Sequence, residues 1–195
     1  MTAAKARKRK KAVLLISILV LLCVGLYFGI RFVIRRYQES RYPESYRDLV
    51  LGASKTYSIP PEKIFAVIKA ESGFDEKAVS PAGAVGLMQI LPETCEWLCR
   101  KRQMEYDPEK LTDPEFNIDF GCYFLNELYQ SFQNWDLVHA AYNAGPNAVR
   151  RWMEDPALYQ NGILISIPYP ETKTYVERIN EYEKNYIELY QSKGW

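Results

Sequence analysis

The chain begins with a long apolar stretch that differs from everything after it. Residues 12–30 carry no charged side chain and are predominantly apolar. A helix of this length, rising about 1.5 Å per residue, matches the hydrocarbon core of a bilayer. We therefore predict a transmembrane anchor over residues 12–34. A cleaved signal peptide is the alternative, but its apolar region would be shorter and would be followed by small residues such as Ala-x-Ala, and no such pattern follows this run.

Beyond residue 43 the apolar positions recur at helical spacing, and strand-like alternation is nearly absent. Proline, serine and aspartate mark helix starts, and glycine marks helix ends and loops. We predict a mostly α fold, with one globular domain at residues 44–195 after a juxtamembrane linker at residues 35–43. The expected helices cover residues 46–57, a segment starting at 58–61 and ending before 73, a segment from 92–93, and residues 113–129, 135–144, 146–154 and 175–190.

The formal net charge of +1 conceals a division along the chain. Residues 1–41 carry ten Lys or Arg and one acid, whereas residues 42–195 carry fifteen and twenty-three. The basic residues concentrate before the apolar run, which favours a cytoplasmic N-terminus and an acidic domain outside the cytoplasmic membrane. A basic tail can bind nucleic acid, but beside a membrane span it is more typical of a topology signal or a lipid contact. We expect residues 1–11 to form a cytoplasmic tail with no nucleic-acid partner.

Cysteine and histidine point to no metal site. Three of the four cysteines lie in the outward domain, so at least one of them cannot pair within it. Cys95 and Cys99 share a helical face, and we expect them and Cys122 to be buried thiols. The single histidine, His139, completes no zinc cluster and is expected to pack in the interior.

One carboxylate occupies a position that favours its protonated form. Glu71 lies in the last turn of an apolar helix, directly before Ser72 and Gly73. The C-terminal end of a helix carries partial negative charge, and an apolar cleft also disfavours a carboxylate, so both would raise the pKa of Glu71. Such an acid is able to protonate a leaving glycosidic oxygen. On position alone, a solvated surface glutamate is the simpler interpretation.

Several sequence blocks around Glu71 match one family in order. Two of them are Ala-Glu-Ser-Gly-Phe at residues 70–74 and Ala-Val-Ser-Pro-Ala-Gly-Ala-Val-Gly-Leu-Met-Gln-Ile at 78–90. Asp-Pro-Glu-Phe-Asn-Ile follows at 113–118, Ala-Ala-Tyr-Asn-Ala-Gly-Pro at 140–146, and Ile-Pro-Tyr-Pro-Glu-Thr at 167–172, running on to Tyr-Val. On these blocks, residues 44–190 resemble the soluble-type lytic transglycosylases of glycoside hydrolase family 23. The resemblance implies a lysozyme-like catalytic domain.

The resemblance also implies that Glu71 is the single catalytic acid and base. In this family the acid protonates the glycosidic oxygen between N-acetylmuramic acid and N-acetylglucosamine, and the same group then acts as a base. The 6-hydroxyl of the muramic acid attacks its own anomeric carbon, which gives a 1,6-anhydro end without adding water. Ordinary glycoside hydrolysis uses two carboxylates instead. No metal or organic cofactor is implied.

The first two blocks contain four further site residues. Ser72 is expected to help hold Glu71 in place, or else only to end the helix. Gly86 would let the backbone approach a sugar, although a loop turn requires glycine equally. Met88 offers an adaptable apolar contact, and without the motif it would be assigned to the core. Gln89 offers a donor and an acceptor for acetamido or hydroxyl groups.

Three residues of the later blocks complete the predicted site. Tyr142 and Asn143 lie at a helix end before Gly-Pro, a suitable place for side chains that point into a cleft, although Asn143 is equally suited to capping. Tyr142 and Tyr175 match the family's tyrosines that line the site and hydrogen-bond near the catalytic glutamate. His139 matches no catalytic position.

We therefore expect a lytic transglycosylase, anchored in the bacterial cytoplasmic membrane by a single pass through residues 12–34. Its partners would be peptidoglycan glycan strands, the membrane and other proteins of the cell-wall machinery. Two alternatives stay open: a lysozyme-like hydrolase of the same fold, and a non-catalytic scaffold that binds the wall. The presence of Glu71, Gln89, Tyr142 and Asn143 argues against the scaffold, because a site without catalytic activity would not need these four residues.

Overall fold

A computed structural model describes residues 3–190, apart from the side chains of residues 3–6 and 12. The first two residues of the predicted tail and the last five of the predicted domain lie outside the described residues. The contacts divide the chain into two units, Met1–Pro43 and Glu44–Trp195. Each unit is described by itself below.

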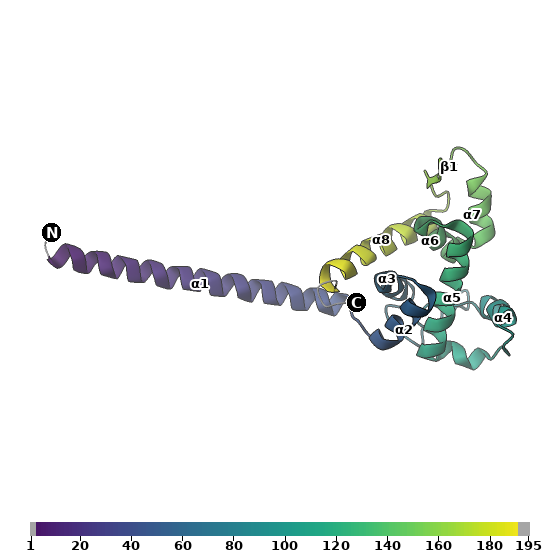
Figure 1. Cartoon of the computed structure of the whole chain (residues 1–195), viewed down its shortest axis with the longest axis horizontal. Coiled ribbons are helices and arrows are strands. Elements are labelled where there is room, and N and C mark those ends of the chain that lie inside the picture. Colours follow the sequence, from purple (N-terminus) through teal and green to yellow (C-terminus); the bar gives the residue numbers. More distant parts are fainter. Residues whose placement is uncertain (1–2, 191–195) are drawn as a thin grey trace. The chain divides into compact units, whose positions relative to one another are not determined.

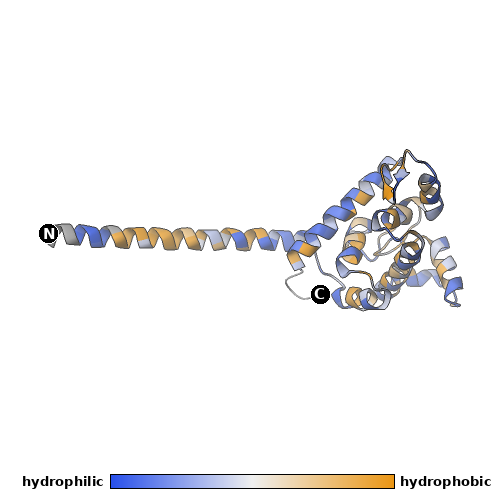
Figure 2. Cartoon of the chain, turned by 45° about the horizontal axis from the view of Figure 1, so that its top comes forward, coloured by the Kyte–Doolittle hydropathy of each residue, from blue (hydrophilic) through white to orange (hydrophobic). Residues whose placement is uncertain are grey.

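The first unit is a single helix, α1 (Ala3–Arg41). Its large apolar side chains are exposed all round, with Leu21 the most exposed at 70%, and Figure 2 shows the apolar residues as a continuous band along its middle. A helix that is apolar on every face needs an apolar environment. By length and composition, α1 is able to cross a membrane. It stays helical through most of the predicted linker, where Arg35 and Glu39 form an ion pair at 3.1 Å.

The second unit is mostly helical, which confirms the predicted fold class. Its helices are joined by loops, and the sheet found among residues 44–190 is one small hairpin. In chain order the elements are α2 (Arg47–Tyr57), α3 (Pro61–Glu71), α4 (Pro92–Lys101), the 3-10 helix η1 (Pro108–Thr112), α5 (Pro114–Phe132), α6 (Trp135–Ala144), α7 (Pro146–Met153), β1 (Tyr159–Gln160), β2 (Ile163–Leu164) and α8 (Pro170–Tyr190).

The core of this unit is built around α3. Five consecutive residues of this helix, Ile64 to Ile68, are buried, so neighbours cover it on every side. It packs against α8 and α2, and Figure 1 shows it in the middle of the unit. Phe65 stacks on Tyr186 of α8 with ring centroids 5.3 Å apart. This packing holds the C-terminal end of α3, where Glu71 lies, against α8.

Proline and capping side chains set the helix starts. Asp113 accepts the backbone N–H of Phe116 at 2.8 Å and so caps α5, and Asn134 caps α6, as expected for these residue types. The predicted start of the last helix at Tyr175 is wrong, because α8 begins at Pro170. Proline at the first helical position needs no N–H partner, and the buried side chain of Thr172 lies in the same first turn.

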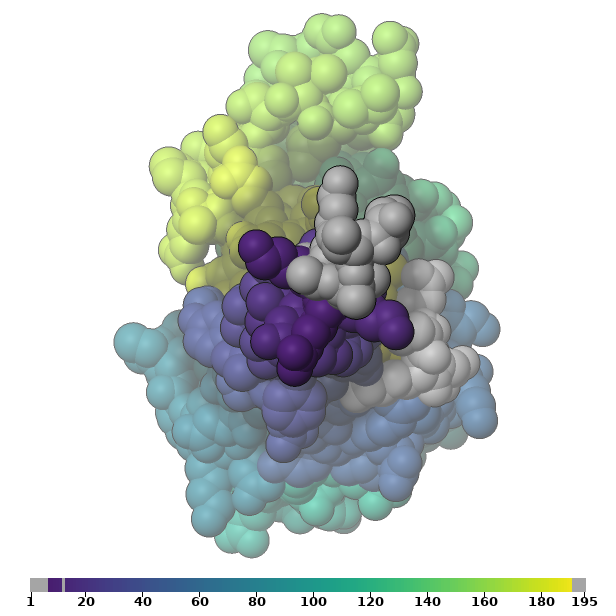
Figure 3. Space-filling model, turned by 90° about the vertical axis from the view of Figure 1, so that its left-hand side faces the viewer, coloured from purple at the N-terminus to yellow at the C-terminus, as the bar shows by residue number. Residues whose placement is uncertain are grey.

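The sequence prediction missed the hairpin of β1 and β2. Its strands pair antiparallel, with Tyr159 opposite Leu164. The turn is Asn161-Gly162, with φ of 51° and 82°, and Asn-Gly with two positive φ values is the sequence favoured in two-residue hairpins. Figure 3 shows the segment around it, in light green, projecting from the top of the molecule.

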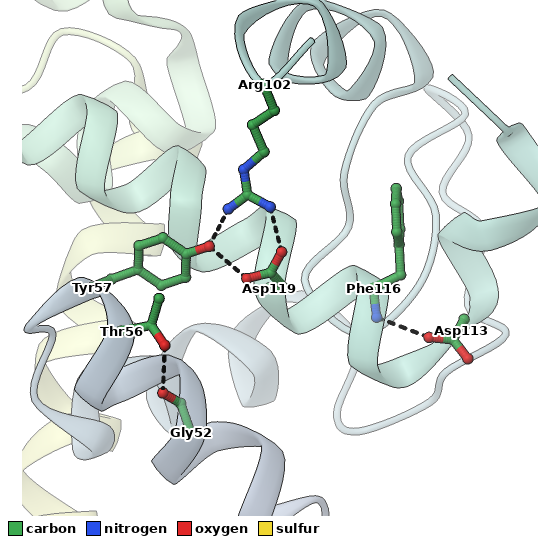
Figure 4. A network of polar contacts seen from close by, with 7 residues as sticks. All are labelled: Gly52, Thr56, Tyr57, Arg102, Asp113, Phe116 and Asp119. Carbon is green, nitrogen blue, oxygen red and sulfur yellow. Dashed lines mark hydrogen bonds and ion pairs between the residues drawn. The ribbon is translucent and has the colours of Figure 1, made fainter. Parts of the chain in front are cut away.

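A polar network ties α2, α4 and α5 together (Figure 4). The Tyr57 hydroxyl donates to the carboxylate of Asp119 and accepts from Arg102, which also pairs with Asp119. The Arg102 guanidinium lies 4.2 Å from the ring centroid of Tyr123. Arg102 follows the last residue of α4, so its contacts anchor the end of that helix to the other two.

The interior contains an imidazole without hydrogen bonds. His139 is fully buried on α6, and neither ring nitrogen has a hydrogen-bond partner in the described part of the chain. Its ring lies 5.7 Å from that of Trp135. Lys63 lies over the same Trp135 ring and pairs with Glu183 at 2.7 Å. The three cysteines of this unit are also buried and unpaired, as predicted.

We expect His139 to make the domain sensitive to acid. Burial, and then the charge of Lys63, lower the pKa of His139 to about 3. The unfolded chain therefore binds the proton more tightly, so the stability that neutral His139 supports is present above pH 6.5 and is lost as the pH falls toward 3. Relative to His139→Leu, the wild-type chain should lose about 2 kcal/mol more unfolding free energy between pH 7 and pH 5. Urea unfolding at both pH values measures this difference, and equal losses in the two proteins would contradict it.

Candidate active site

Glu71 is the last residue of α3, as the sequence predicted. Its side chain is half-buried, and burial raises its pKa to about 7. A hydrogen bond from Tyr175 and the positive charge of Arg178 act in the opposite direction. No second carboxylate among the described residues contributes to this pKa shift. A carboxyl group that titrates near neutral pH is able both to give and to take a proton.

The partners of Glu71 come from α8 and α6. The Tyr175 hydroxyl donates to Oε1 of Glu71, and Arg178 lies one turn further along α8, 5.9 Å from the Tyr175 ring centroid. Burial and then the charge of Glu71 raise the pKa of Tyr142 well above its ordinary value. Tyr142 therefore lies near Glu71, although its hydroxyl donates to the Met88 carbonyl at 2.8 Å. Both predicted tyrosines thus reach the site.

A compact loop over residues 78–90 lies beside the end of α3. Val85 makes single antiparallel bridges to Val79 and Ile90. The Ser72 hydroxyl donates to the Leu87 carbonyl at 2.8 Å and accepts the Phe74 backbone N–H at 3.1 Å. Ser72 therefore ties this loop to the residues that follow Glu71, and it makes no direct bond to the Glu71 carboxyl group.

Gln89 supports the loop from within. Its amide nitrogen donates to the carbonyls of Ala78 and Gly86, at 3.0 and 2.9 Å, which uses both of its N–H groups. Its backbone is left-handed, with φ of 48°, a conformation that is uncommon for non-glycine residues. The Gln89 carbonyl oxygen is thus the part of the amide able to accept a bond from a ligand.

Asn117 supports the loop from behind and was not predicted as a site residue. It lies on α5 with 1% of its surface exposed. Its amide nitrogen donates to the carbonyls of Leu111 and Val85, at 2.7 and 3.0 Å, and its oxygen accepts the Met88 backbone N–H at 2.7 Å. A buried amide with all three of these bonds holds the backbone on either side of Gly86 in one conformation.

Gly86 and Met88 fit tightly against α5. Gly86 has φ of +82°, and a Cβ there would lie 2.3 Å from the Asn117 amide nitrogen and 2.4 Å from the Leu111 carbonyl oxygen. The Met88 side chain is fully buried and lies against Gly121, where a Cβ would meet its sulfur at 2.3 Å. In this structure the loop thus requires glycine at position 86, and Met88 is a core residue.

Asn143 lies at the end of α6 and is exposed. Its side-chain oxygen accepts the hydroxyl of Thr172 at 2.7 Å, which links α6 to the first turn of α8. The structure therefore brings Glu71, Tyr175 and Tyr142 together. It places Gly86, Met88 and Gln89 in the supporting loop, Ser72 at the end of α3 where it binds that loop, and Asn143 at the α6–α8 junction. Sequence reasoning missed Asn117, Arg178 and Thr172. Asn117 and Thr172 lie within matched blocks, and Arg178 lies one helical turn after Tyr175.

We expect Tyr175→Phe to shift the pH dependence of activity. The Tyr175 hydroxyl lowers the pKa of Glu71, so removing it should move that pKa above 7 and move the alkaline limb of the rate profile to higher pH. The maximal rate should fall about tenfold because the carboxyl group loses its orienting bond. Rates of product release between pH 5 and pH 9 test this. Tyr129→Phe, on a tyrosine that stacks on Trp135, is the matched control, and coincident profiles for Tyr175→Phe and wild type would contradict the assignment.

Comparisons with known proteins give matches that cover most of the globular unit. Residues 48–160 match the family described as the transglycosylase SLT domain. The soluble lytic murein transglycosylase of Escherichia coli K12 is 37% identical over 76% of this chain and 24% of its own length. Membrane-bound lytic murein transglycosylase C of Edwardsiella ictaluri is 29% identical over 72% of this chain and 46% of its own.

A solved structure resembles the globular unit closely. The lytic transglycosylase Slt of Pseudomonas aeruginosa, solved as an inactive Glu-to-Gln mutant, superimposes with a TM-score of 0.71 at 31% identity, over 77% of this chain and 25% of that one. The chain thus spans about a quarter of the length of the soluble relatives it matches.

Proposed function

The chain belongs to the transglycosylase SLT domain family, and on that premise we propose that it is a peptidoglycan lytic transglycosylase. It would cleave the β-1,4 bond between N-acetylmuramic acid and N-acetylglucosamine and leave a 1,6-anhydro end. The observation that carries the proposal is the half-buried Glu71, which has a pKa of about 7, a hydrogen bond from Tyr175 and no second carboxylate acting on it in the described part of the chain.

The proposed reaction uses Glu71 twice. In its protonated form it donates a proton to the glycosidic oxygen, and the bond from that oxygen to the anomeric carbon of muramic acid breaks. The resulting carboxylate then accepts the proton of the muramic 6-hydroxyl as that oxygen attacks the same anomeric carbon. The proton lost in the first step is regained in the second, and no water enters the product. A pKa near neutral suits both steps.

The surrounding residues would orient the sugar and the acid. Tyr175 fixes one oxygen of Glu71, and the charge of Arg178 stabilises the carboxylate between the two steps. The loop over residues 78–90 offers the Gln89 carbonyl oxygen as an acceptor for a sugar N–H or O–H group. Asn143, which directly follows Tyr142 in the sequence, offers an exposed amide. Tyr175, Arg178 and Asn143 lie on packed helices, which hold a site more precisely than loops do.

We propose a membrane-anchored arrangement of the chain. Membrane-bound relatives and the apolar helix α1 support anchoring. The finer topology is a single pass through residues 12–34, a cytoplasmic tail at residues 1–11, a linker at residues 35–43 and an extracytoplasmic domain from residue 44. The linker is short, so cleavage would occur on glycan close to the membrane.

Product chemistry tests the proposed function. The full chain in detergent is incubated with peptidoglycan, and the released fragments are analysed by mass spectrometry. A 1,6-anhydro end is lighter by one water than the reducing end that a hydrolase releases. Anhydro ends support a transglycosylase, whereas reducing ends alone would identify a lysozyme-like hydrolase. Fragments absent with wild-type protein but present with a lysozyme control would support the non-catalytic scaffold instead.

A further inference from the structure

A hollow that Glu71 does not line lies between α2 and the segment that runs through η1 into α5. It is an open groove with a volume of about 740 Å³, within the size range of sites that hold ligands. None of the residues assigned to the active site lines it. Figure 4 labels residues of both walls: Gly52 and Thr56 on α2, and Asp113, Phe116 and Asp119 at the start of α5 and on it. We call this hollow the α2–α5 groove.

The groove has an apolar part between the two helices. Leu49 and Ala53 line it from α2, and Phe116 and Phe120 line it from α5. The two phenylalanine rings stack with centroids 4.1 Å apart. Met104, with 45% of its surface exposed, lies at one end. An exposed methionine beside an aromatic wall is typical of surfaces that accommodate apolar side chains of a partner.

The rim of the groove is strongly acidic. Six carboxylates line it against one basic residue, Lys110. Three of the six are engaged: Asp107 and Asp113 cap η1 and α5, and Asp119 binds Arg102. The other three have no ion pair within the described residues and are exposed; they are Asp48, Glu109 and Glu115.

We propose that the α2–α5 groove binds a basic peptide segment of a partner protein, with one or two apolar side chains inserted between α2 and α5. Lys or Arg residues of that segment would face Asp48, Glu109 and Glu115. The choice of partner follows from charge. Peptidoglycan stem peptides carry carboxylates of their own and would be repelled by this rim, whereas a basic segment is attracted to it. The proposal also gives a use to part of the acidic excess of residues 42–195.

A binding assay on the full chain tests this proposal without reference to glycan cleavage. The probe is a fluorescent hexapeptide with Leu-Phe between pairs of Lys and Arg, short enough to avoid forming a membrane-active helix. Its affinity is measured by fluorescence anisotropy in non-ionic detergent, at low and high salt. Two matched peptides replace the basic residues with Glu, or Leu-Phe with Ser-Ser.

Matched protein variants locate the site. Asp48→Asn combined with Glu115→Gln should weaken binding of the probe roughly tenfold at low salt, because two exposed charge contacts are lost. Met104→Ser should weaken it several-fold through the apolar contact. The control is Glu177→Gln combined with Glu181→Gln on α8, which removes the same charge from an exposed surface outside the groove.

The proposal predicts that only the basic peptide with Leu-Phe binds well, and that the control variant binds it as wild type does. Equal affinity of the rim variant and the control variant would overturn it, since binding would then reflect net charge alone. Tighter binding of the Glu peptide, or displacement of the probe by a purified stem peptide, would overturn the choice of a basic protein segment. Because no cleavage is measured, these outcomes are independent of the proposed enzymatic activity.

Discussion

Glu71→Gln is expected to lower the rate of glycan cleavage by about 10³-fold or more, because the proposed mechanism assigns both proton transfers to this residue. Glutamine keeps an oxygen that can accept the Tyr175 hydroxyl, so the packing at the end of α3 should survive. The mass-spectrometric assay for anhydro ends measures the loss. Glu93→Gln, on an exposed glutamate of α4, is the control. Wild-type rates in Glu71→Gln would remove Glu71 as the acid.

The same substitution should stabilise the protein in alkaline solution. The pKa of Glu71 is raised to about 7 in the folded state, so the fold favours the protonated form. The stability associated with that proton is complete below the ordinary pKa of 4.5 and is lost as the pH rises through 7. Above pH 8 the ionised carboxylate should cost on the order of 3 kcal/mol, which glutamine avoids.

Thermal or urea unfolding at pH 5 and pH 9 measures this effect. Glu71→Gln should unfold at a higher midpoint than wild type at pH 9, and the difference should shrink at pH 5. Glu71 would then lower the stability of the folded protein and also be required for the reaction, a trade-off that is common in catalytic sites. Equal midpoints at pH 9 would show that the surroundings of Glu71 do not disfavour its charge.

Gly86→Ala is expected to disrupt both folding and activity. The added Cβ would lie 2.4 Å from a backbone carbonyl, that of Leu111, which has no flexible end to move aside. The positive φ of Gly86 adds strain for any other residue. Unfolding free energy should fall by about 3 kcal/mol or more. Displacement of the loop by even about 1 Å should reduce cleavage about 10²-fold or more.

Gly83→Ala separates backbone strain from collision. Gly83 lies in the same loop with φ of +83°, but a Cβ there meets nothing within 4 Å. It should cost only about 1 kcal/mol and leave the rate unchanged. Comparable losses in the two variants, by urea unfolding and by the product assay, would show that the support from Asn117 and Leu111 is not what makes Gly86 necessary.

Local features of the sequence identified much of the fold and the chemical centre of the site. The apolar run before residue 34 indicated α1, and the proline starts and apolar spacing indicated α3 and its end at Glu71. These features can be predicted from the sequence because helix starts, helix ends and amphipathic spacing depend on residues within a few positions of one another. The Asn161-Gly162 turn is also a local signal. Its hairpin was missed because strands of two residues are too short to show an alternating pattern.

The sequence by itself determined a mostly helical chain with an apolar anchor segment, and it pointed to one glutamate at a helix end. Only the tertiary structure decided what surrounds that glutamate. Tyr175 meets Glu71 across 104 positions because α3 packs against α8, and Asn117 reaches Met88 across 29. The tertiary structure also buries Met88 and directs the Gln89 amide nitrogen to the Ala78 carbonyl. Such contacts depend on which helices pack together. The position of Glu71 in the sequence indicated only that its pKa is raised, and burial in the folded domain decides how far.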